Sequence, residues 1–237
     1  MEEEIFNWNG RLGPMELQVS PTTFIPSTVT TLLAQELVIN DGDSAVDVGC
    51  GTGILAILAA KLGATRVSGV DQSPDVVEVA SGNAARHHVA NRTTFYQGDL
   101  FAPLPDDLTA DVIIGDVSGI PDILAECSGW FPSGKGGGTK GSELPIKMLH
   151  DAVSYLSDRG RLFLPTGTLQ DEQSILDAAN SIYRNVRLLS ERRIPFPANL
   201  AESDAVKKLV DSGIISITAR GSRYFWEARI WELSAPA

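Results

Sequence analysis

The sequence predicts an α/β fold: a Rossmann-like sheet of seven mostly parallel strands, with an antiparallel strand at the C-terminal end and helices on both faces. Short apolar runs alternate with segments of helical spacing, a pattern typical of βαβ units in a parallel sheet. Residues 44–71 contain, in order, a strand, a glycine turn, an apolar helix and a second strand. Two extended segments flank Arg220-Gly221-Ser222, which indicates the antiparallel pair.

Each further element has a local signal. Ser27 or Thr28 can cap a helix that starts at Pro26, because side-chain hydroxyls accept hydrogen bonds from the free N–H groups of the first turn. The apolar run ADVIIG at 110–115 is expected to be a buried strand. On similar grounds we expect helices at 26–37, 73–88, 143–157, 170–180 and 202–212, and strands at 94–97, 160–165, 186–193, 214–219 and 224–233.

Length and composition limit the classes of protein. A chain of 237 residues suits one α/β domain, which we place at 26–237 with a substrate-side insertion near 195–212, preceded by an N-terminal flap at 1–25. The net charge of −11 argues against a large phosphate-neutralising surface. The acidic N-terminus and the lack of a long apolar run favour a cytoplasmic protein. Two cysteines are too few for a zinc site, and no metal is expected.

The glycine turn carries the clearest chemical signal. Asp47 is followed by glycines at 49, 51 and 53, where the backbone must bend sharply and approach a ligand closely. The dinucleotide-binding fingerprint would need a sixth-position glycine, but Ile54 stands there, which disfavours an NAD-dependent oxidoreductase. An acid two residues before the first glycine suits a ligand with an amino group. Asp71, at the end of the next strand, is placed to accept hydrogen bonds from ribose hydroxyls.

These residues resemble a known superfamily. VDVGCGTG is similar to the first motif of class I S-adenosylmethionine (SAM) methyltransferases. GTGILAILAAKLGATRVSGVDQS resembles the arginine and ribosomal-protein methyltransferases, and ELQVSPTTFIPSTVTTLLAQEL and GGGTKGSELPIKMLHDAVSYLSDRGRLFL resemble the release-factor glutamine methyltransferases. The resemblance covers about residues 15–170. It implies a SAM-dependent methyltransferase.

Acids close four successive strands, where an open parallel sheet collects its ligands. The resemblance implies that Asp71 binds the ribose, that Asp99 accepts from the adenine amino group, and that Asp47 shapes the methionine end of the site. The full set of cofactor contacts that we expect is Thr30, Asp47, Gly49, Cys50, Gly51, Thr52, Gly53, Asp71, Gln72, Asp99, Leu100 and Asp116.

The sequence departs from the resemblance after the fourth strand. Glutamine and DNA-amine methyltransferases carry Asn/Asp-Pro-Pro-Tyr/Phe there, but this chain has DVSGIP at 116–121, which disfavours amide or nucleobase methylation. Asp116 and Glu126 only loosely resemble the two glutamates that arginine methyltransferases have around this loop. We expect Asp116 to be the catalytic contact to the nucleophile, and Trp8, Ser118, Gly119 and Trp130 to contact the substrate.

The sequence thus favours methyl transfer by in-line displacement to the N, O or C atom of a small molecule, with no nucleic-acid or membrane partner. Two alternatives stay open: a protein side-chain N-methyltransferase of the glutamine or arginine kind, and a SAM-binding protein without catalysis. The glycine patch at 134–141 lacks the spacing of a P-loop, and we expect a mobile surface loop there.

Overall fold

The computed structural model describes residues 4–236 of the chain, which divides into two compact units. Unit 1 comprises Met1–Asp116 and Asp151–Leu164, and unit 2 comprises Val117–His150 and Pro165–Ala237. The chain therefore leaves unit 1 directly after Asp116, the predicted catalytic residue.

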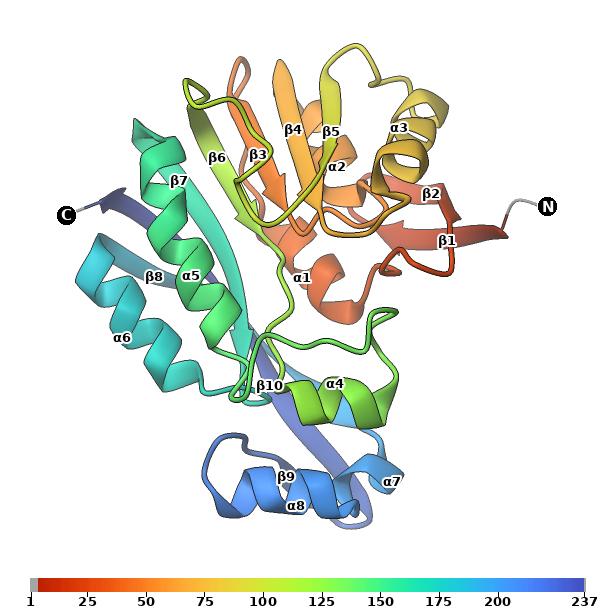
Figure 1. Cartoon of the computed structure of the whole chain (residues 1–237), viewed down its shortest axis with the longest axis vertical. Helices are drawn as coiled ribbons and strands as arrows, with labels where there is room; N and C mark the ends of the chain where they lie inside the picture. Colours follow the sequence, from red (N-terminus) through yellow and green to blue (C-terminus); the bar gives the residue numbers. More distant parts are fainter. Residues whose placement is uncertain (1–3, 237) are drawn as a thin grey trace. The chain divides into compact units, whose positions relative to one another are not determined.

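Unit 1 is built on a parallel sheet (Figure 1), whose strands are β3 (Ser44–Val48), β4 (Arg66–Asp71), β5 (Thr93–Gln97), β6 (Ala110–Gly115) and β7 (Leu156–Gly167). The order is β5-β4-β3-β6-β7, and every neighbouring pair is parallel. Val46 lies opposite Ser68 on one side and Ile113 on the other. These central strands are apolar because helices and sheet bury them, as expected for a parallel sheet.

The described part of unit 1 also contains α1 (Thr28–Glu36), α2 (Ile54–Leu62), α3 (Val76–Arg86) and a short 3-10 helix (Val153–Tyr155). The Ser27 side chain caps α1, and the Thr30 side chain accepts in return from the Ser27 N–H, which makes a capping box. Helix α2 contacts β3, β4 and β5, and its residues Ile54 to Ala60 are all buried. A helix that is apolar on every face belongs in the interior.

An N-terminal hairpin of β1 (Glu4–Gly10) and β2 (Gly13–Val19) packs on unit 1. Trp8, opposite Met15, is only 2% exposed, and its indole N–H donates to the Thr31 hydroxyl at 3.1 Å. The Asn83 side chain of α3 donates to the Gln18 carbonyl and accepts from the Gln18 N–H. The hairpin is thus fixed by packing and by polar contacts to both α1 and α3.

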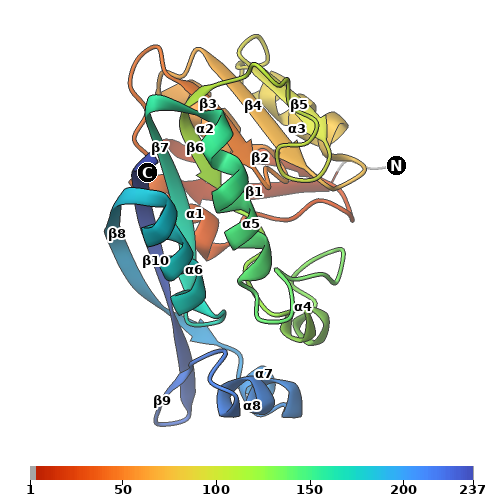
Figure 2. The ribbon, with the colours of Figure 1, turned by 60° about the vertical axis from the view of Figure 1, so that its left-hand side comes forward.

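Unit 2 contains α4 (Asp122–Ser128), most of α5 (Glu143–Ala152), α6 (Glu172–Ile182), α7 (Ala198–Ala201), α8 (Asp204–Asp211), β8 (Tyr183–Phe196), β9 (Thr218–Arg220) and β10 (Arg223–Pro236). Strand β10 pairs antiparallel with β8 and with β9. Figures 1 and 2 both show α7, α8 and β9 at the same end of β10. A cluster of buried residues, including Leu124, Phe196 and Leu209, forms the apolar core there.

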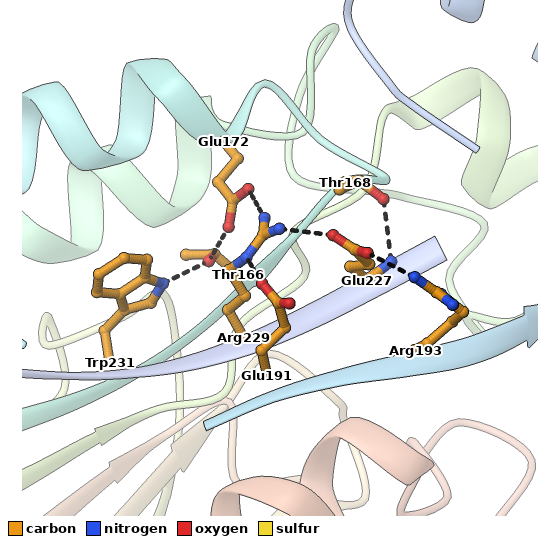
Figure 3. Close-up of polar contacts among 8 residues, drawn as sticks. All are labelled: Thr166, Thr168, Glu172, Glu191, Arg193, Glu227, Arg229 and Trp231. Atoms are coloured by element: carbon orange, nitrogen blue, oxygen red, sulfur yellow. Dashed lines mark hydrogen bonds and ion pairs between the residues drawn. The ribbon is translucent and has the colours of Figure 1, made fainter. Parts of the chain in front are cut away.

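A charge network joins the other elements of unit 2 (Figure 3). The Arg229 guanidinium of β10 donates to Glu191 at 2.5 Å, to Glu227 at 2.7 Å and to Glu172. Glu172 also accepts from the Thr166 hydroxyl at 2.6 Å, and that hydroxyl accepts from the Trp231 indole at 2.8 Å. Desolvation lowers the pKa of Arg229, but the carboxylates outweigh it and the pKa is raised overall. The arginine is therefore held charged among β7, α6, β8 and β10.

The predicted fold class is confirmed. Among the described residues the main sheet has eight strands, one more than predicted, because the short strand β9 pairs with β10. The C-terminal strand β10 is antiparallel to β8 and β9, as predicted. The prediction of a strand at 214–219 is mostly wrong: only Thr218–Arg220 is a strand. Ile215 instead packs into the apolar cluster of unit 2, and the Ser216 N–H donates to the Thr168 carbonyl. Helices α4 and α7 were not predicted, because each is too short for a periodic pattern.

Candidate active site

The glycine turn between β3 and α2 has the geometry that its sequence predicts. Gly49, Gly51 and Gly53 have φ angles of 82°, 49° and 80°, in the left-handed region that favours glycine. The N–H groups of Gly49 and Cys50 both donate to the Val70 carbonyl, at 2.8 and 3.0 Å. A Cβ at Gly51 would lie 3.2 Å from the Phe24 carbonyl oxygen. Other residues would therefore strain this turn and crowd the segment above it.

The Asp47 side chain links the end of β3 to the first turn of α2. It is fully buried, and its Oδ2 accepts from the Ala56 N–H in the first turn of α2 at 2.9 Å. Its Oδ1 and the Thr52 hydroxyl are buried without a hydrogen-bond partner among the residues that the structure describes. Burial, followed by the charge of Asp116, raises the pKa of Asp47 well above its usual value. Buried polar atoms normally have hydrogen-bond partners, so Asp47 Oδ1 and the Thr52 hydroxyl can each still form a hydrogen bond.

Asp71 joins the end of β4 to the same turn. Its Oδ2 accepts from the Gly51 N–H at 2.9 Å, and its Oδ1 accepts from the Ser73 N–H at 2.8 Å. Further along this edge, the Gln72 side-chain amide donates to Asp99 at 2.9 Å. Leu100 is buried with φ 47°, a conformation that non-glycine residues rarely adopt and that clusters at functional sites. The four candidates therefore line one edge of the sheet.

Asp116 follows β6 and is held by α1. The Thr30 hydroxyl donates to its Oδ2 at 2.9 Å. Burial raises the pKa of Asp116 to about 6, although the Thr30 hydrogen bond opposes the shift. The two residues line a cavity of about 10 Å³ together with Phe24, Pro26, Ile54, Leu55 and residues 49–52. That volume is about what one water needs. The carboxylate is thus brought next to the glycine turn.

Asn83 is a supporting residue that the sequence analysis missed. It is fully buried, and its side-chain amide donates to the Thr52 carbonyl at 2.9 Å as well as to Gln18. It therefore connects the glycine turn, α3 and the N-terminal hairpin. A buried asparagine on the apolar face of a predicted helix was the available signal.

Most of the expected cofactor residues lie around this turn, and the expected substrate contacts are divided between the two units. Trp8 is packed in the hairpin and is only 2% exposed, and its contact with substrate stays a prediction. Ser118 and Gly119 belong to unit 2. Trp130, also in unit 2, is 37% exposed and meets Phe196 edge-on, with ring centroids 5.9 Å apart.

The remaining polar groups do not suggest another chemistry. The Cys50 thiol is buried, and burial followed by the charge of Asp47 raises its pKa, so it is a poor nucleophile. Within residues 4–236 no group of three or more His, Cys, Asp or Glu side chains is arranged to hold a metal ion. In the same range, no helix has the length and apolar character needed to cross a membrane.

Comparison with known proteins identifies the chemistry. The family model of ribosomal protein L11 methyltransferase (PrmA) matches residues 23–126. A protein of Methanocaldococcus jannaschii, provisionally named a protein N5-glutamine methyltransferase, is 25% identical over 77% of this chain and 91% of its own length. The ribosomal protein L11 methyltransferase of Aliivibrio salmonicida is 36% identical over 49% of this chain, but only 39% of that protein is covered.

By these matches the chain is a SAM-dependent methyltransferase. The predicted cofactor, SAM, and the predicted enzyme class are confirmed by these relatives. Among solved structures, the Thermus thermophilus 16S rRNA N2 G1207 methyltransferase in complex with AdoMet and guanosine has a TM-score of 0.64. It is 12% identical, and the match covers 99% of this methyltransferase and 51% of that chain, which supports the fold alone.

The predicted partner is wrong. The sequence analysis favoured a small-molecule substrate and no nucleic acid. The relatives are instead named for protein substrates, L11 and protein glutamine, and the structural neighbour is named for ribosomal RNA. Substrate choice depends on segments outside the shared cofactor motif, and these have no sequence code that pattern analysis can use.

Proposed function

We propose that this methyltransferase modifies a side-chain nitrogen of a protein. The observation that carries the proposal is the match to the Methanocaldococcus jannaschii relative, which extends over 91% of that protein and is named for a protein substrate. The match to the L11 methyltransferase family over residues 23–126 favours the same substrate class. The net charge of −11 is compatible with a basic protein partner, which it would attract over long range.

We place SAM over the glycine turn. The turn is a cradle that a Cβ at Gly51 would crowd, and the unpartnered Thr52 hydroxyl and Asp47 Oδ1 lie at its base. Asp71 uses one lone pair of each oxygen for backbone N–H groups and keeps others for ribose hydroxyls. When bound, SAM supplies an electrophilic methyl group. The residues assigned to it are Thr30, Asp47, Gly49, Cys50, Gly51, Thr52, Gly53, Asp71, Gln72, Asp99, Leu100 and Asp116.

We assign Asp116 as the contact to the attacking nitrogen. A carboxyl with a pKa of about 6 is mostly ionised at neutral pH, yet it is a better proton acceptor than an ordinary aspartate. It can hold an ammonium group, accept its proton and orient the neutral amine. A carboxamide also loses a proton on methylation, but it carries no positive charge for a carboxylate to hold and its nitrogen lone pair is delocalised. The nucleophile that fits best is therefore an amine such as a lysine side chain.

The test uses the purified protein, methyl-labelled SAM and a cell extract separated into protein, RNA and small-molecule fractions. We expect label in a protein band, and fragmentation of the labelled peptide should place the methyl group on an amine nitrogen. The Asp116→Asn variant serves as the matched control and should leave the band unlabelled. Label confined to the RNA or small-molecule fraction would overturn the protein proposal, and a methylated glutamine would overturn the assignment of an amine.

A further inference from the structure

Two segments of unit 2 are packed backbone to backbone. We call Val117–Pro121, which continues from Asp116, the acceptor loop, and Gly134–Gly141 the glycine segment. The Gly137 N–H donates to the Ile120 carbonyl at 2.7 Å, and the Asp122 N–H donates to the Gly138 carbonyl at 2.9 Å. The Gly136 N–H donates to the Asp122 side chain, also at 2.9 Å. Residues 134–141 form neither a helix nor a strand, and residues 134, 135, 139 and 140 are exposed, as expected of a surface loop, but the backbone of the segment is engaged by these bonds.

The glycines of this segment are required by space. A Cβ at Gly136 would lie 2.2 Å from the Ile120 carbonyl oxygen, and one at Gly137 would lie 2.3 Å from the Ser118 carbonyl oxygen. Both distances are far below van der Waals contact, and the obstructing atoms are backbone. Neither glycine has a positive φ, so any residue could adopt its backbone conformation. Close approach to the acceptor loop is what excludes a side chain.

Gln170 lies against the acceptor loop at a further point. A Cβ at Gly119 would lie 2.5 Å from the Gln170 Oε1, and Gln170 is only 8% exposed. The turn that carries Gln170 is tied to the glycine segment, because the Asp171 N–H donates to the Lys140 carbonyl at 3.0 Å and Lys140 Nζ pairs with Asp171 at 3.0 Å. The acceptor loop is thus enclosed by parts of unit 2 that are themselves connected.

We propose that the glycine segment positions the acceptor loop, and through it Asp116, for methyl transfer. The loop VSGIP forms neither a helix nor a strand and contains Gly119, so contacts with its neighbours help to fix its conformation. Transfer by displacement depends chiefly on alignment, and a misplacement of about 1 Å can cost about 100-fold in rate. Gly136 and Gly137 are positioning residues, and Gln170 is a third. The catalytic consequence rests on the proposed function.

The experiment compares Gly137→Ala and Gly136→Ala with a matched control, Gly134→Ala. Gly134 has φ 66°, but a Cβ there meets nothing within 4 Å, so this variant carries backbone strain without displacing the loop. We expect kcat to fall about 100-fold in the first two variants, with the Kd for SAM unchanged, and to stay near the wild-type value in the control. Amide hydrogen exchange of the acceptor loop should accelerate in the first two only.

A purely structural role would lower the thermal stability of all three variants and leave kcat unchanged, and that result would overturn the proposal. If Gly136→Ala and Gly137→Ala do not fold, Gln170→Ala tests the proposal by removing a contact instead of adding one. This variant should also accelerate hydrogen exchange in the acceptor loop. Unchanged exchange there would equally overturn the proposal. Hydrogen exchange needs no substrate, so failure of the positioning proposal is distinguishable from failure to find a protein acceptor.

Discussion

The Thr30 hydroxyl donates a 2.9 Å hydrogen bond to Oδ2 of Asp116 across 86 residues of sequence. It brings the first turn of α1 to the end of β6 and fixes one oxygen of the carboxylate. The same hydrogen bond opposes the rise in the pKa of Asp116 that burial causes, so Thr30 affects both the orientation and the charge of the carboxylate.

Asp116→Asn should remove the proton acceptor and keep the contact to Thr30, since a carboxamide oxygen also accepts a hydrogen bond. We expect turnover to fall about 100-fold or more, with SAM binding retained, because the contacts proposed for the rest of the cofactor do not change. Steady-state kinetics together with calorimetric titration of SAM would measure both. Undiminished turnover would remove Asp116 from the catalytic step.

The pH dependence of activity should report Asp116. Because the carboxylate form is needed, kcat/KM should rise with pH through an inflection near 6. Thr30→Val deletes a hydrogen bond that lowers this pKa, so the inflection should move to higher pH, whereas Thr30→Ser should leave it in place. An inflection that does not differ between the two variants would show that another group controls the profile.

The same shift affects stability with a definite sign. The folded state raises the pKa of Asp116 above the usual 3.8, so the folded protein binds the proton more tightly than the unfolded chain. The resulting stabilisation is present below pH about 4 and is lost as the pH rises through about 6. Denaturant titrations at several pH values should show a smaller loss in Asp116→Asn than in the wild type, because Asp47, whose pKa is also raised, still contributes.

Arg229 should couple more strongly to Glu172 than to Glu191. The side chains of Arg229 and Glu172 are 19% and 15% exposed, whereas that of Glu191 is 46% exposed and better screened by water. Removing Arg229 alone should cost about 2–4 kcal/mol, because carboxylates of unit 2 lose their partner. Double-mutant cycles with alanine would measure each coupling. Arg187→Ala, which breaks the exposed pair with Glu232, is the control and should cost less than about 1 kcal/mol.

Trp8 should matter for stability and not for substrate affinity. Trp8→Ala empties a buried site in the hairpin and should cost about 3–5 kcal/mol in the free energy of unfolding. Trp8→Phe keeps most of the ring volume and loses the bond to Thr31, which should cost about 1 kcal/mol. Urea titration would measure both variants. A raised KM for the protein substrate in Trp8→Phe, without loss of stability, would support Trp8 as a substrate contact.

The parallel sheet, the glycine turn and the cofactor can be predicted from the sequence alone. These features are written in contiguous residues: the apolar run of a buried strand, the glycines at 49, 51 and 53, and Asp71 at the end of the following strand. Each depends on interactions within a few tens of residues, where periodicity and backbone sterics leave few alternatives. Helices α4 and α7 escaped prediction because each is too short to show a helical period in the sequence.

The contacts that residues make with distant parts of the chain can be read only from the tertiary structure. The pairing of Thr30 with Asp116, the burial of Trp8 and the contact of Gly137 with Ser118 each join segments that no spacing rule connects. The sequence does not distinguish an exposed aromatic side chain from a packed one. It also does not distinguish a flexible run of glycines from one whose glycines are required because another backbone lies close to them. Their roles differ because packing, which acts between distant segments, selects among locally equivalent possibilities.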